Sequence, residues 1–181
     1  MRFLYLLILI FMSIFCSGIS NNEVSQSLTL GRMENVFKEK LPKDNIIVYT
    51  KVPRGLIISF EDKTFFNCGE ARIKESSLNT LNILVSLLNK FPNYCIIEAH
   101  TDEKLPECSK YKKTWEISIA RASNIAEYMV MCQNLSLDRI FPFGFGNMMP
   151  FAKNVAHINK QIDKKMNNRI DFVIIEYDTK R

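Results

Sequence analysis

The stretch from Tyr94 to Ala122 constrains the fold of this chain more than any other. It begins with an apolar run that predicts a strand, passes through His100-Thr101-Asp102 and a polar loop, and ends in a helical pattern that starts at Thr114. The stretch places a carboxylate at the strand end and a guanidinium, that of Arg121, on the following helix. Such a pair of opposite charges can bind a zwitterion, for example a diamino acid.

Hydrophobic periodicity predicts further elements on both sides of this stretch. The expected strands are 46–50, 56–60, 94–99, 138–143 and 170–177, and the expected helices are 71–90 and the one that starts at Thr114. Strands that alternate with helices indicate βαβ units with the helices on a shared face. We therefore expect an α+β domain over residues 46–181. It should be a βαβαβ-type mixed sheet of about four strands, with helices packed on one face.

The helix that starts at Thr114 has one apolar stripe, formed by Trp115, Ile119, Ala122, Ala126 and Met129. This stripe is the expected core face, and Thr114 is the expected N-cap. At 100° per residue, Arg121 lies about 120° from the stripe and can face a cleft. Downstream, we expect Gly144 and Gly146 to be turn glycines that follow the fourth strand.

The first twenty residues have the pattern of an export signal. Arg2 precedes an apolar run from Phe3 to Phe15 that only Ser13 interrupts. Thirteen helical residues span roughly 20 Å, short of the ~30 Å hydrocarbon core, so we expect cleavage near Ser20 rather than a membrane anchor. A second route would lipidate Cys16 and tie the protein to the outer or inner membrane. Residues 21–45 should form a tether with a short amphipathic helix.

Export also bears on the cysteines. Cys68, Cys95, Cys108 and Cys132 remain in the mature chain, and an even number in an oxidising compartment permits two disulfides in three connectivities. Alternatively, some are buried thiols, and Cys95, inside a predicted strand, fits that description best. There is no CxxC motif or His/Cys cluster, so we expect neither a metal nor a cofactor. The net charge of +5 is spread along the chain, so we expect no nucleic-acid partner.

Several short segments together resemble the OmpA-like peptidoglycan-binding domain. They are Gly55-Leu56-Ile57-Ile58-Ser59-Phe60, Phe65-Phe66, His100-Thr101-Asp102, Ile117-Ser118 with Arg121-Ala122, Gly144 and Gly146 with Pro150 and Asn154, and Asn167-Asn168-Arg169-Ile170. Their order is that of the family, and the resemblance covers about residues 46–178. It is strongest to the branch of the flagellar stator protein MotB, in which a longer loop precedes a helix that opens like residues 114–118 here.

The resemblance implies non-catalytic binding of the diamino acid in the peptidoglycan stem peptide, in the periplasm or on an outer-membrane-associated envelope. Asp102 would accept hydrogen bonds from the ligand ammonium, and Arg121 would hold its carboxylate. The matching family positions add Thr101, Thr114, Asn154 and Arg169, which would contact or brace the site.

Three positions depart from the family pattern. Ala99 stands where the family usually has Gly, Thr114 where it has Asn, and Asn168 where it has Arg. One alternative is therefore an envelope-assembly protein with weakened wall binding, acting as a homodimer or with another envelope protein. A stator-like role is the other, although no carboxylate for proton transfer lies between Phe3 and Phe15.

An enzymatic alternative would combine Asp102, His100 and Ser118 as a hydrolase set. Ser118 lies within the predicted helix rather than on a sharp strand-to-helix turn, and no oxyanion glycine follows it. We therefore expect no catalytic activity.

Overall fold

The computed structural model describes residues 30–102, 104–151 and 165–175. Within these ranges the chain forms one five-stranded sheet in the order β1-β2-β5-β3-β4. The strands are β1 (Ile47–Val52), β2 (Gly55–Glu61), β3 (Cys95–His100), β4 (Ile140–Gly146) and β5 (Arg169–Ile175). Neighbours pair antiparallel except β3 and β4, which are parallel. The predicted mixed sheet is confirmed, with five strands instead of about four because both strands of the β1–β2 hairpin join it.

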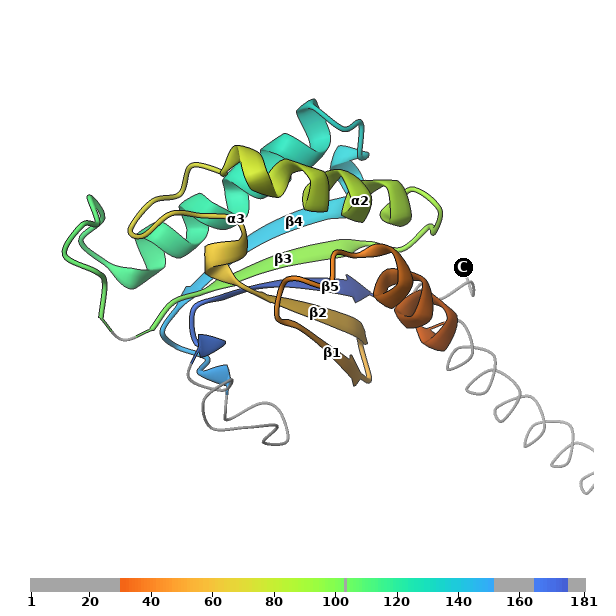
Figure 1. Cartoon of the computed structure of the whole chain (residues 1–181), viewed down its shortest axis with the longest axis horizontal. Helices are drawn as coiled ribbons and strands as arrows, with labels where there is room; N and C mark the ends of the chain where they lie inside the picture. Colours follow the sequence, from red (N-terminus) through yellow and green to blue (C-terminus); the bar gives the residue numbers. More distant parts are fainter. Residues whose placement is uncertain (1–29, 103, 152–164, 176–181) are drawn as a thin grey trace, which may run out of the picture.

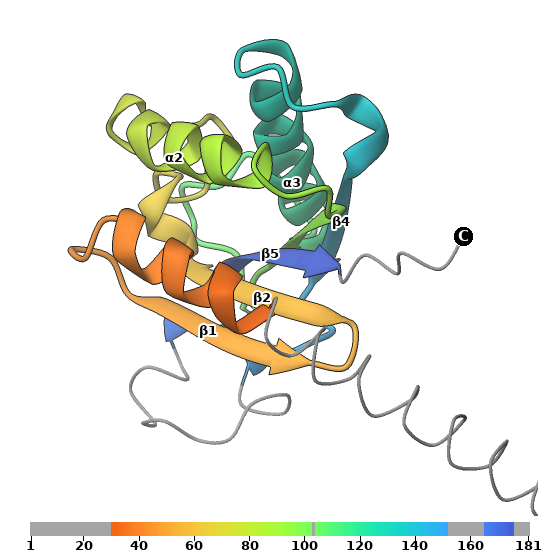
Figure 2. The same ribbon diagram turned by 90° about the vertical axis from the view of Figure 1, so that its right-hand side faces the viewer.

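The helices lie on one face of this sheet, as expected (Figure 1). They are α2 (Leu78–Leu88), α3 (Thr114–Met131) and a helix over residues 30–40, which lies above β1 and β2 in Figure 2. Short 3-10 turns are η1 (Asp62–Thr64), η2 (Glu75–Ser77) and η3 (Leu137–Arg139). The predicted helix 71–90 is therefore shorter, because the Ala71 carbonyl accepts a 2.7 Å bond from Asn124 on α3 and Ile73 pairs with Phe66 in an isolated bridge.

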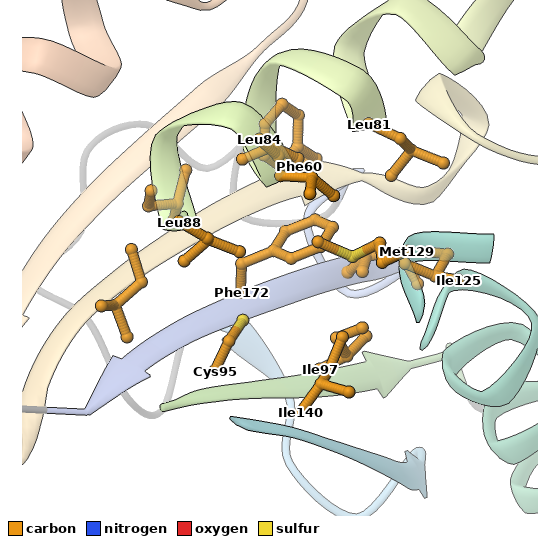
Figure 3. Close-up of a cluster of buried hydrophobic side chains, with 14 of the residues drawn as sticks. Phe60, Leu81, Leu84, Leu88, Cys95, Ile97, Ile125, Met129, Ile140 and Phe172 are labelled. Atoms are coloured by element: carbon orange, nitrogen blue, oxygen red, sulfur yellow. The ribbon is translucent and has the colours of Figure 1, made fainter. Parts of the chain in front are cut away.

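The core lies between the sheet and the helices (Figure 3). Alternate residues of β5 point into it, and the ring of Phe172 packs edge-on against Phe60 at 5.7 Å and Phe65 at 5.9 Å. Cys95 is a buried thiol in β3, as predicted, and burial raises its pKa to about 12. The helix over 30–40 contributes Met33 and Phe37 to the same cluster, so this part of the expected 21–45 tether belongs to the core of the domain.

Helix α3 packs on β4 with almost no space between the two backbones. A Cβ atom at Gly144 would lie 2.2 Å from the Ile119 backbone nitrogen. The expectation that Gly144 is a turn glycine was wrong: it lies inside β4, which continues to Gly146. Gly146 ends the strand with φ of +55°, a conformation that glycine adopts at little cost.

The expected core stripe of α3 was also wrong in part. Trp115 is 56% exposed, because it projects from the first turn of α3, beside the residue where β4 ends. The buried apolar face of the helix consists instead of Ile117, Ala122, Ile125, Ala126 and Met129.

Three predictions lie outside the described residues: the export signal over 1–20, the lipidation of Cys16 and the role of Asn154. Among the residues that are described, the helices are too short or too polar to cross a membrane.

The close approach at Gly144 makes a stability prediction. Gly144→Ala should lower the free energy of unfolding by about 3 kcal/mol, because the added methyl group meets backbone atoms that cannot move independently. The matched control is Gly31→Ala in the helix over 30–40, where the nearest atom to the new methyl lies 3.8 Å away. This control should be neutral or stabilising by up to about 1 kcal/mol. Urea unfolding followed by circular dichroism measures both, and equal stability of the two variants would contradict the packing described.

Candidate functional site

A cavity of about 490 Å³ opens at the carboxyl end of β3. Three of the predicted site residues line it together: Thr101 and Asp102, which follow the strand, and Arg121 from α3. The opposite wall comes from η1 and the loop after it, including Asp62 and Phe66. The structure thus brings the predicted carboxylate and guanidinium to one cavity, although they lie on separate elements.

Arg121 is held firmly although it lines the cavity. It is only 3% exposed, and its Nε donates to the Glu70 carbonyl at 2.9 Å. Its Nη1 donates to Asp62 Oδ2 at 2.7 Å, and its guanidinium lies 5.0 Å from the centre of the Phe66 ring. These two hydrogen bonds leave Nη2 as the donor group they do not use. The protein itself therefore orients Arg121, through the carboxylate of Asp62 and the ring face of Phe66.

Sequence reasoning missed Asp62. Burial raises the pKa of this carboxyl above its ordinary value, although the Arg121 guanidinium opposes the shift. Asp62 is 59 residues from Arg121, and a single aspartate after a strand carries no signal of that pairing. Together with Asp102 it supplies negative charge to a cavity that Lys63, Lys104 and Arg121 line with positive charge. A cavity with charges of both signs suits a zwitterionic ligand better than a simple anion or cation.

Backbone hydrogen bonds fix the segment that carries Asp102. The Thr101 amide donates to the Gly146 carbonyl at 2.9 Å, and the Asp102 amide donates to Asn168 Oδ1 at 2.9 Å. Asn168 also lines the cavity. The sequence alone marks Asn168 only as a residue that stands where the family usually has an arginine. Its position directly before the last strand was the signal that could have placed it here, because β5 pairs antiparallel with β3.

Two other predicted site residues are not among those that line the cavity. Thr114 is the first residue of α3 rather than its N-cap, and its hydroxyl donates to Asn147 Oδ1 at 3.2 Å. Arg169 lies on the other face of the sheet, where it donates to Asp171 at 2.8 Å and stacks 5.4 Å from the Phe151 ring. Their contribution to ligand binding stays a prediction, and this geometry gives them at most an indirect role.

His100 belongs to a buried polar cluster on that other face. Its Nε2 lies 3.4 Å from Asp171 Oδ2, its ring stacks on Phe145 at 5.2 Å, and Glu98 is the third member. Burial works to raise the pKa of Asp171, but His100 and Arg169 together hold it below its ordinary value.

Arginine side chains already contact both carboxylates of this cluster. Arg54 lies 3.0 Å from Glu98 and Arg169 lies 2.8 Å from Asp171, so each carboxylate already has a cation. The hydroxyl of Ser118 donates to the Trp115 carbonyl at 3.0 Å and accepts from the Gly146 amide at 2.9 Å. The structure therefore engages Ser118 in the α3–β4 interface and His100 in the polar cluster.

The model of the OmpA family matches residues 65–168, more than half of the chain, and the chain therefore belongs to the OmpA family. Two curated relatives come from Bacillus subtilis: the uncharacterized protein YtxE, 28% identical over 121 residues, and motility protein B, 27% identical over 150 residues. These matches cover 67% and 79% of this chain but 48% and 56% of the relatives. The chain thus spans about half the length of the curated relatives it matches.

Solved structures share the fold. A MotB-like protein from Desulfovibrio vulgaris aligns with a TM-score of 0.71 at 19% identity, over 84% of this chain and 95% of that one. The cell wall anchor of the type VI secretion system from Pseudomonas aeruginosa aligns with a TM-score of 0.62 at 14% identity, over 82% of this chain and 97% of that one.

The contacts of Arg121 make a second stability prediction. Asp62→Ala should lower the free energy of unfolding by about 2 kcal/mol, because it leaves a buried guanidinium without its carboxylate. The side chain of Asp62 is 18% exposed, so water offsets part of the cost a fully buried pair would show. The matched control is Lys40→Ala, which removes an ion pair in which both partners are exposed, Lys40 by 55% and Glu39 by 69%, and which should leave the stability unchanged. Chemical denaturation checks both, and an Asp62→Ala variant as stable as the control would mean that Arg121 does not depend on Asp62.

Proposed function

We propose that this protein binds peptidoglycan without catalysis and anchors part of the cell envelope to the wall. The ligand group is the diamino acid of the stem peptide. Asp102 accepts hydrogen bonds from its ammonium group, Arg121 donates to its carboxylate, and the hydroxyl of Thr101 adds a neutral contact.

The observation that carries this proposal is the shared cavity of Asp102 and Arg121. Arg121 is oriented before any ligand arrives, by Asp62, by the Glu70 carbonyl and by the Phe66 ring. A donor that is already in place loses little conformational freedom on binding, so more of its interaction energy contributes to affinity. Charge-assisted hydrogen bonds contribute roughly 1.5–3 kcal/mol each, which suits modest affinity for a polymer that presents many copies of the ligand.

Membership of the OmpA family supports the same function. The structure from P. aeruginosa is named a cell wall anchor. The structure from D. vulgaris is named a MotB-like protein, and one relative from B. subtilis is named motility protein B. We infer a location in the cell envelope, facing the wall, with peptidoglycan as the partner. Lipidation of Cys16 would attach the protein to a membrane, and this lipidation stays a prediction.

A stator-like role is the second candidate, and the similarity to motility protein B favours it. Both roles use the same wall-binding site, so they differ in what the rest of the protein is attached to. An envelope-assembly protein with weakened wall binding is the outcome to infer if the binding test fails.

The test is sedimentation of the purified protein with insoluble peptidoglycan sacculi. The wild-type protein should sediment, and Asp102→Asn should lower its affinity at least about tenfold, because one charge-assisted hydrogen bond is lost. Arg121→Lys should have a similar effect, since lysine keeps the charge but not the planar fork of donors. A free diamino acid should compete, and a monoamino analogue of the same length should not.

The matched control is Asp138→Asn. Asp138 is an exposed aspartate in η3, directly before β4, and it lies at the end of that strand opposite to Gly146. It makes the same chemical change and should sediment like the wild type. Circular dichroism should show that all variants are folded. Wild-type sedimentation by Asp102→Asn would exclude the site, and no sedimentation by the wild type would exclude the function.

A further inference from the structure

Two exposed cysteines meet at the rim of the same cavity. The sulfur atoms of Cys68 and Cys108 lie 2.8 Å apart, although the two residues are 40 positions apart in the sequence. Cys68 lines the cavity, and Cys108 lies in the segment that runs from Asp102 to the start of α3, which supplies Lys104, Leu105 and Pro106 to the cavity wall. Residues 104–113 of this segment form the green loop beside the start of α3 in Figure 1.

Backbone packing brings these two segments together independently of the thiols. A Cβ atom at Gly69 would lie 2.8 Å from the backbone of Ser109 and 3.0 Å from the carbonyl carbon of Cys108. Gly69 also has φ of +70°, so a larger residue would be strained there for two reasons. On the other side, the Ser109 amide donates to the Pro106 carbonyl at 2.9 Å, which closes a turn around Cys108. The backbones of the two segments therefore fix their close approach, which does not depend on the thiols.

We propose that Cys68 and Cys108 form a disulfide that fastens the 104–109 wall of the cavity to the wall that follows η1. The other two thiols in the described ranges differ in their surroundings: Cys95 is buried in β3, and Cys132 lies after the last residue of α3. Bond formation brings the sulfur atoms about 0.8 Å closer, to roughly 2.05 Å.

The bond forms by thiol–disulfide exchange with an oxidised dithiol or another disulfide. One cysteine thiolate attacks a sulfur of the oxidant, and the S–S bond of the oxidant breaks to release a first thiolate. The second cysteine thiolate then attacks the mixed disulfide and releases a second thiolate. The protein loses two protons and two electrons, and the oxidant gains the electrons and leaves as two thiols. Both cysteines are exposed, so the oxidant can reach them.

The consequence for the site rests on the proposed function. Asp102 is separated from Cys108 by five residues, so fixing Cys108 limits the motion of the segment that leads away from Asp102. Arg121 is held from the other wall, through the Glu70 carbonyl two residues after Cys68. The disulfide thus links the segment that carries Asp102 to the segment that holds Arg121. It lowers the conformational entropy that both segments lose when they bind a ligand.

The first experiment detects the bond without any ligand. The purified protein is incubated with oxidised glutathione, alkylated without reduction and digested with trypsin. Cleavage after Lys63, Arg72, Lys104 and Lys110 places the two cysteines in separate peptides, 64–72 and 105–110. We expect these peptides to appear joined, two hydrogen atoms lighter than their sum. The melting temperature should also fall by about 5 °C or more on reduction in the wild type, and not in Cys68→Ser or Cys108→Ser. Alkylation of both cysteines after oxidation would overturn the proposal.

The second experiment separates this proposal from the function on which it rests. Reduction, Cys68→Ser and Cys108→Ser should each weaken sedimentation with sacculi about 2- to 10-fold. Cys132→Ser, the matched control, should sediment like the wild type and still show the joined peptides. A joined peptide with no effect of reduction on sedimentation would overturn the link to ligand binding. A joined peptide in a protein that never sediments would overturn the wall-binding function and leave the disulfide standing.

Discussion

The contact between α3 and β4 at Gly144 is the constraint on which the candidate site depends. Because glycine lets the helix backbone approach the strand so closely, the Ser118 hydroxyl can accept from the Gly146 amide in a buried position. The Gly146 carbonyl then accepts from the Thr101 amide, which starts the segment that carries Asp102. One line of contacts thus sets the height of α3 over the sheet, and with it the distance between Arg121 on the helix and Asp102 beyond the strand.

The guanidinium of Arg121 is oriented before any ligand binds, and its burial costs free energy. A guanidinium that is 3% exposed needs a partner, and Asp62 supplies one although burial raises the pKa of that carboxyl. The Glu70 carbonyl and the Phe66 ring hold the group from further directions. Lysine could not satisfy these three contacts together, because its single ammonium lacks a planar fork that bonds along one edge and stacks on a ring. The arginine is thus both part of the fold and a group that can donate to a ligand.

The sequence predicted the strand before Asp102, the following helix and the mixed sheet, because apolar periodicity is a local property that survives in the fold. It predicted which face of α3 is buried less well. Trp115 fits the apolar stripe, yet it lies beside the end of β4, and helical spacing carries no information on where a neighbouring strand ends. The same limit explains why the sequence does not indicate the role of Asp62 and why the turn predicted at Gly144 is wrong. Both roles depend on partners far away in the chain, Arg121 and Ile119, and such partners leave no periodic signal.

The alternation of side chains along strands explains how the predicted motifs divide. In His100-Thr101-Asp102, His100 ends β3 and joins the polar cluster on the face away from the helices, whereas the next two residues leave the strand and line the cavity. In Asn168-Arg169, the first residue lines the cavity and holds the Asp102 amide, and the second begins β5 and pairs with Asp171 on the other face. In each motif, therefore, one part lines the ligand cavity and the other part belongs to the sheet. A substitution at Asn168 should thus act on the cavity directly, while Arg169 can influence it only through the sheet that both share.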